Sequence, residues 1–144
     1  MNAAWLWFAV ALAAIPLALY AGFTLRARRL IRRAGRAYQA ERWDECLMAY
    51  RNYLLLAART VTPETTGEIL RYMAYAVGEA DLAADLGGVK RAFKDLHTWA
   101  PARRTDPQAH RNYYEAYGRL LQTLRALEFT PREPHEHAPG CAHS

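Results

Sequence analysis

The side chains best suited to chemistry gather in the segment PREPHEHAPGCAHS, residues 131–144. Imidazole nitrogens and a thiolate sulfur are the ligands that Zn, Ni and Cu prefer. Three prolines and a glycine predict no regular element here, so the ligands would lie on a flexible chain that could fold round an ion. The spacing H-x-H…C-x-H matches no structural zinc motif, and a solvated, disordered tail is the alternative interpretation. The candidate metal ligands are His135, His137, Cys141 and His143.

The rest of the sequence carries no constellation typical of an enzyme. It contains no glycine-rich phosphate loop, no H-E-x-x-H and no G-x-S-x-G. Cys46 falls on an apolar helical stripe, which favours a buried thiol over a nucleophile. His97 and His110 have no Cys or carboxylate at ligand spacing, which favours surface or capping roles. We therefore predict a non-enzymatic protein with no small-molecule substrate and no cofactor, apart from the ion considered for the tail.

A cluster of arginines marks the most basic part of the chain, and no acid precedes Glu41. Arginines that directly follow an apolar span resist translocation and fix that side as cytoplasmic. They also attract anionic lipid headgroups. No aromatic interleaving or recognition motif accompanies them, so we expect no nucleic-acid partner. The cluster consists of Arg26, Arg28, Arg29, Arg32, Arg33 and Arg36.

The element that precedes these arginines is an apolar run over residues 3–25 without an ionisable side chain. At ~1.5 Å per residue a helix of this length exceeds the ~30 Å hydrocarbon core of a bilayer. Trp5 and Trp7 lie near one end and Tyr20 near the other, where amphipathic rings prefer to sit. A cleaved signal peptide would need a basic start and a shorter core. We expect a single-pass anchor with the N-terminus outside and the remainder cytoplasmic.

The composition excludes several classes of protein. The chain has 144 residues, of which 52% are hydrophobic, and two cysteines, Cys46 and Cys141. The apolar content excludes disorder throughout, two cysteines exclude a disulfide-stapled module, and a single long apolar run excludes a polytopic transporter. The predicted organisation is an anchor over 1–25, a basic juxtamembrane helix over 26–42, a helical domain over 43–130 and the tail over 131–144.

Apolar periodicity predicts that everything after the anchor and before the tail is helical. Residues 25–40 continue or restart the membrane helix, and 43–59 form the clearest amphipathic helix. Further helices are expected over 63–80 and 81–98, the second bent or split by Gly87-Gly88. The last helix begins with Asp106 as its N-cap and Pro107 at its first position. No run shows strand alternation, so the fold class is all-α.

The stretch from Leu30 to Leu54, with AGRAYQAERWDECLMAYRNYL at its centre, resembles one tetratricopeptide (TPR) repeat. Small residues allow two helices of that repeat to approach, and an aromatic fills the space between hairpins. Arg33 and Ala37 depart from the usual leucine and aromatic, and residues 64–100 show only a helix pair. The resemblance implies TPR-like stacked hairpins. The packing positions it matches are Ala34, Trp43, Cys46, Tyr50 and Leu54.

Two functional hypotheses follow from this organisation. The first is a membrane-anchored adaptor or scaffold whose TPR-like surface binds a protein partner. The second is an accessory subunit of a large integral complex (respiratory, photosynthetic or secretory), because the alanine-rich span permits close helix packing. A third alternative is a metal-binding accessory protein acting through the tail. Membrane and protein partners are expected in the first two cases.

Overall fold

Five helices and one very short strand pair make up the computed structural model, which describes residues 2–134. The mostly helical architecture expected from the sequence is confirmed, whereas a TPR repeat as such is not shown. The helices are α1 (Ala3–Gln39), α2 (Trp43–Ala57), α3 (Pro63–Glu79), α4 (Leu86–Trp99) and α5 (Pro107–Ala126), and the strands are β1 (Leu82–Ala83) and β2 (Thr130–Pro131).

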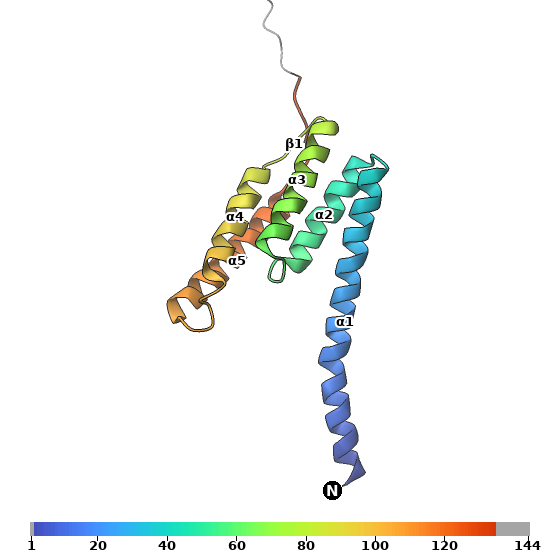
Figure 1. Ribbon diagram of the computed structural model, residues 1–144, viewed down its shortest axis with the longest axis vertical. Helices are drawn as coiled ribbons and strands as arrows, with labels where there is room; N and C mark the ends of the chain where they lie inside the picture. The colour runs from blue at the N-terminus through green and yellow to red at the C-terminus, as the bar shows by residue number, and fades with distance from the viewer. Residues whose placement is uncertain (1, 135–144) are drawn as a thin grey trace, which may run out of the picture.

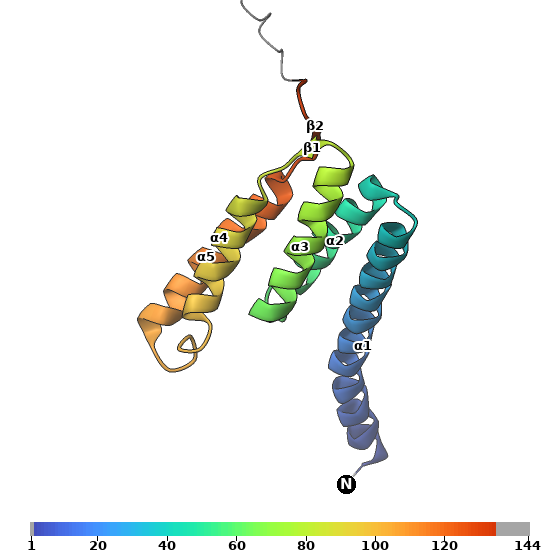
Figure 2. The ribbon, with the colours of Figure 1, turned by 45° about the horizontal axis from the view of Figure 1, so that its top comes forward.

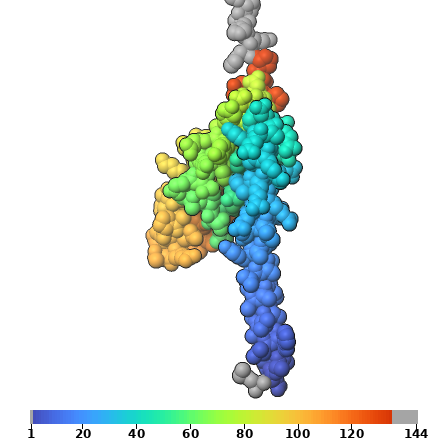
Figure 3. Space-filling view, turned by 45° about the vertical axis from the view of Figure 1, so that its right-hand side comes forward, coloured from blue at the N-terminus to red at the C-terminus, as the bar shows by residue number. Residues whose placement is uncertain are grey.

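The first helix, α1, combines the apolar run and the arginine-rich segment in one uninterrupted rod that continues through Pro16 (Figure 1). Residues 3–22 are exposed along their whole length, and this half of α1 projects beyond the rest of the molecule (Figure 3). By length and composition it could cross a membrane. Near the other end, Ala34 and Ala37 are completely buried.

The remaining helices pack in pairs around a single apolar core. The final third of α1 lies on α2, α3 lies between α2 and α4, and α4 packs closely on α5 (Figures 1 and 2). Each helix contributes an apolar face at helical spacing, and their largest buried members include Leu47, Leu54, Met73, Phe93 and Tyr113. Burial of these faces is the main favourable term that holds the bundle together.

Two helix starts follow the local signals in the sequence. The Thr62 hydroxyl accepts a hydrogen bond from the backbone N–H of Thr65 at 3.2 Å, and Pro63 occupies the first helical position of α3. The Asp106 carboxylate accepts one from the N–H of Gln108 at 2.8 Å ahead of α5. In each case a side chain satisfies an N–H that the helix leaves without a partner.

The prediction of a helix over 81–98 is wrong about where that helix begins. Asp81 adopts a left-handed conformation with φ 52°, Leu82 lies in β1, and α4 begins only at Leu86. The Gly87-Gly88 pair does not split the helix, because it belongs to the first turn. There the Asp85 carboxylate caps the N–H of Gly88 at 2.8 Å. A Cβ at position 88 would lie 2.5 Å from Asp85 Oδ2, so glycine is what this cap requires.

The expectation of an entirely helical soluble part also needs correction. β1 and β2 pair antiparallel, with Leu82 opposite Pro131 and Ala83 opposite Thr130. The backbone N–H of Arg132 donates to the Asp81 carbonyl at 3.0 Å. Residues 131–134 are therefore partly tied to the bundle, because a distant loop supplies hydrogen-bond partners that local sequence does not reveal.

Candidate functional site

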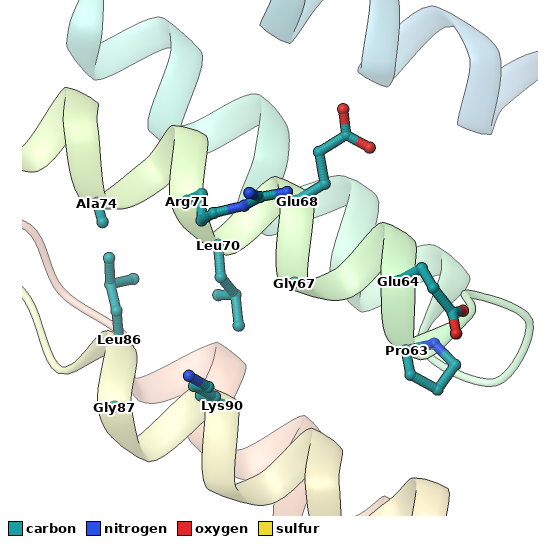
Figure 4. Close-up of a pocket in the computed structure, with 10 residues that line it drawn as sticks. All are labelled: Pro63, Glu64, Gly67, Glu68, Leu70, Arg71, Ala74, Leu86, Gly87 and Lys90. Carbon is teal, nitrogen blue, oxygen red and sulfur yellow. The ribbon is translucent and has the colours of Figure 1, made fainter.

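A groove lined mostly by apolar atoms lies between α3 and α4. Two adjoining hollows of about 450 and about 400 Å³ form it. Because the helices are antiparallel, the groove runs from Ala74 and Leu86 at one end to Pro63 and Thr98 at the other (Figure 4). We call this feature the α3–α4 groove.

Small residues on the facing turns leave the groove open. Gly67 and Ala74 of α3 and Gly87 of α4 line it, and a Cβ placed on Gly67 would meet no atom within 4 Å. Leu70 and Phe93 are buried at its floor, with exposed fractions of 8% and 2%. The groove is therefore a mostly apolar trough that could accept the side chains of a bound segment.

Charged side chains line both sides of the α3–α4 groove. The α3 side carries Glu64, Glu68 and Arg71, whereas the α4 side carries only basic residues, Lys90 and Lys94. In Figure 4 Lys90 extends into the space between the helices while Glu68 turns away from it. Within the described residues neither lysine pairs with a carboxylate. The α4 side therefore offers two ammonium groups to an acidic residue of a ligand.

His97 lies at the far end of the α3–α4 groove, one turn beyond Phe93. The two rings stack with centroids 5.9 Å apart. Burial lowers the pKa of His97, and the Glu64 carboxylate offsets this only in part. Its Nε2 is buried and has no hydrogen-bond partner among residues 2–134. A neutral imidazole thus adds a polar atom to an otherwise apolar end.

A second feature, the aromatic cluster, joins the end of α1 to α3. Tyr38 lies 5.2 Å from Tyr72 and 5.7 Å from Tyr75, and Trp43 lies 5.9 Å from Tyr75, all between ring centroids. Tyr50, beneath them, stacks on Tyr72 at 6.2 Å. Tyr75 remains 52% exposed and Tyr72 38% exposed. The cluster therefore both links α1 to the helix that carries the groove and presents aromatic surface.

The side chains assigned to TPR-like packing lie on α1 and α2 and belong to the apolar core or pack against it. Ala34, Cys46 and Leu54 are fully buried and Tyr50 nearly so, whereas Trp43 is only half-buried. Burial raises the pKa of the Cys46 thiol to about 11, so it stays protonated at neutral pH. A protonated, enclosed thiol is poorly suited to nucleophilic attack or metal binding.

The predicted metal ligands fall elsewhere. His135, His137, Cys141 and His143 lie outside the described residues, so the tail site stays a prediction. Within residues 2–134, no group of three or more His, Cys, Asp or Glu side chains is placed to hold an ion.

The arginine cluster follows the exposed surface of α1 without a break in the helix. Arg33 also makes a contact within the molecule, because its Nε lies 2.9 Å from Glu45 Oε1. The hydrogen bond from Arg33 lowers the pKa of Glu45, with Arg42 adding to the effect at 3.3 Å. The Arg33–Glu45 pair bridges α1 and α2, and all six arginines of the cluster remain exposed.

Comparison of the chain with protein-family models gives no match. Comparisons with curated proteins and with solved structures give none either. The arrangement of side chains therefore carries the functional argument alone.

Sequence reasoning missed the α3–α4 groove. A signal was present in Gly67 and Ala74, which recur seven residues apart and so share one face of a helix. The pairing of that face with Gly87 depends on how α3 and α4 pack. The exposed aromatic surface also has a signal in the sequence, because five tyrosines are more than one buried stripe accommodates: Tyr72, Tyr75, Tyr113, Tyr114 and Tyr117.

Proposed function

We propose that the protein is a membrane-anchored, non-enzymatic adaptor whose α3–α4 groove binds an apolar segment of a partner protein. The observation that carries this proposal is α1 itself. A single rigid helix joins a chargeless, fully exposed apolar half to a buried end at Ala34 and Ala37. Such a connection would hold the groove at a fixed position relative to a bilayer.

Membrane anchorage is supported over a cleaved leader by this continuity. Removal of the apolar half would require a cut inside an uninterrupted helix whose later turns pack on α2. The arginine cluster supports a cytoplasmic bundle and an N-terminus on the opposite side. The proposed localisation is a single-pass membrane protein with its helical domain in the cytoplasm.

The α3–α4 groove supports a peptide ligand of defined chemistry. Its floor suits two or three apolar side chains of a helix or extended segment, and Lys90 and Lys94 suit an acidic residue beside them. A TPR-like arrangement of α1 to α3 remains part of the proposal. Its support is the small-residue contact at Ala34 and the aromatic contact at Trp43.

The test fills the groove without disturbing the fold. Gly67→Leu places a side chain where a Cβ meets no neighbour, and leucine favours helix more than glycine by up to ~0.8 kcal/mol. Gly118→Leu is the matched control, because Gly118 is exposed within α5, also meets nothing within 4 Å, and lies away from the groove. Both variants should therefore keep or raise the melting temperature.

Binding is measured in the anchored full-length chain with a photoreactive amino acid at the position of Thr98, which lines the groove and is exposed. The chain with the unaltered groove and the Gly118→Leu variant should give the same discrete crosslinked product in intact cells. The Gly67→Leu variant should not give this product. If Gly67→Leu gave the same product as the control, the groove would not be the binding surface.

The accessory-subunit hypothesis remains a second candidate because of the surface of α1. Its small residues are all exposed, and small residues permit close approach of helices in lipid. Replacement of residues 3–25 by polyleucine separates the two functions, because an adaptor keeps its partner and an integral subunit loses its complex. The small residues are Ala3, Ala4, Ala9, Ala11, Ala13, Ala14, Ala18, Ala21 and Gly22.

A further inference from the structure

The direction of successive helices gives the bundle two distinct ends. α1 runs away from its apolar half, and each following helix reverses direction (Figures 1 and 2). The connections 58–62 and 100–106 therefore lie toward the apolar half of α1, and we call them the proximal connections. The connections 40–42, 80–85 and 127–133 lie at the opposite, distal end.

Charge is divided between these ends. The proximal connections hold Arg59, Arg103 and Arg104 against one acid, Asp106, whose carboxylate is engaged in capping α5. The distal connections hold only Arg42 and Arg132 as basic residues. Their five acids are Glu41, Asp81, Asp85, Glu128 and Glu133. The bundle is thus basic where α1 leads toward its apolar half and acidic where it is farthest from it.

Side-chain contacts place the first proximal connection level with the start of the arginine cluster. Arg26, the first arginine after the apolar run, lines a common hollow with Leu55 and Leu56 near the end of α2. Arg59 follows Leu56 within one helical turn. Its guanidinium lies 5.6 Å from the ring centroid of Tyr114 on α5 and donates to the Tyr114 hydroxyl at 3.4 Å.

The second proximal connection reaches farther in the same direction. Asp106, the N-cap of α5, precedes Tyr113 by seven residues, which corresponds to ~10 Å along the helix axis. Arg103 is held there by two contacts, with its guanidinium 4.7 Å from the Tyr113 ring centroid and Nη1 3.3 Å from the Ala100 carbonyl. Arg104 beside it is exposed. Both side chains thus belong to an ordered basic end.

From this arrangement we propose that the proximal end of the bundle docks on the anionic headgroups of the leaflet that α1 enters. The inference rests on the proposed anchorage and adds the orientation of the bundle. Arg59, Arg103 and Arg104 contact the headgroups together with Arg26 and its neighbours, and Tyr114 provides an amphipathic ring at the same level. The acidic distal end is repelled from the surface, so the bundle stands end-on with the α3–α4 groove facing sideways into the cytoplasm.

The test measures proximity to headgroups in the full-length protein reconstituted in vesicles. A fluorophore is attached at Thr105→Cys in a Cys141→Ser chain, where Cys46 is buried, and a quencher is attached to lipid headgroups. Vesicles contain phosphatidylcholine alone or with phosphatidylserine. Quenching at position 105 should increase with phosphatidylserine and fall with added salt, whereas a label at Ala40→Cys on the distal end should not respond.

Paired arginine variants identify the residues responsible. Arg59→Gln/Arg104→Gln removes two of the exposed charges assigned to the headgroup contact and should reduce the phosphatidylserine-dependent quenching. Arg91→Gln/Arg125→Gln removes the same charge from exposed positions of α4 and α5 nearer the distal end and should preserve it.

Three outcomes would overturn the inference. The first is equal quenching at position 105 in both vesicles, and the second is an equal loss in both arginine variants. In these two cases the protein still floats with the vesicles, so the anchorage itself stands. In the third the protein does not float with vesicles of either composition, which refutes the anchorage and the orientation together.

Discussion

Substitution of Ala34 by leucine should loosen the contact that joins the apolar helix to the bundle. Ala34 is 0% exposed in α1, and its neighbours across the contact belong to α2. Leucine adds three carbon atoms where no space exists, and overpacking of this kind costs ~1–3 kcal/mol. A loss of about 2 kcal/mol corresponds to a fall of roughly 8–16 °C in the melting temperature of a domain of this size.

The adjacent residue provides a matched control in the same turn of α1. Gly35 is partly exposed, and a Cβ there meets nothing within 4 Å. Gly35→Leu therefore adds a larger side chain without a clash and should stabilise α1 by up to ~0.8 kcal/mol through helix propensity. Both full-length variants are unfolded by heat in the same detergent, and loss of tertiary packing is followed by near-ultraviolet circular dichroism.

The two substitutions should therefore shift the transition in opposite directions. If Ala34→Leu left the melting temperature unchanged, α1 would not be packed tightly on α2. If Gly35→Leu were as damaging as Ala34→Leu, the face of α1 turned toward α2 would be assigned incorrectly.

Further predictions concern the aromatic cluster, the buried thiol and a helix cap. Trp43→Ala should lower the free energy of unfolding by about 1–2 kcal/mol. This is less than the ~3–5 kcal/mol lost with a fully buried tryptophan, because Trp43 is half-buried. An unchanged melting temperature would mean that its ring contacts do not hold α1 and α3 together. Burial raises the pKa of Cys46 from 9.0 to about 11, so the unfolded chain loses this proton first and stability should fall as pH rises from about 9 to about 11. That fall should be smaller in Cys46→Ala, and an identical pH profile would contradict the assignment. Thr62→Ala should cost ~1 kcal/mol by removing the cap of α3, which denaturant unfolding can measure.

Features that depend on neighbouring residues could be predicted from the sequence. The chargeless run predicts one long apolar helix, and Pro16 within it does not end that helix. Thr62-Pro63 and Asp106-Pro107 fixed two helix starts, because a cap bonds to an N–H only two or three residues away. Apolar spacing likewise predicted most of the buried faces, including Cys46 on α2.

Tertiary structure alone decided the features built from residues far apart in the chain. The strand at Leu82 exists because residues 130–131 return beside it, and this pairing displaces the start of α4 to Leu86. The α3–α4 groove depends on Gly67 and Gly87 facing the same space. The basic proximal end depends on two separate loops lying on the side of the bundle nearer the apolar half of α1. Each is set by the packing of whole helices, whose mutual placement follows from the burial of several faces at once and has no signature in any single segment.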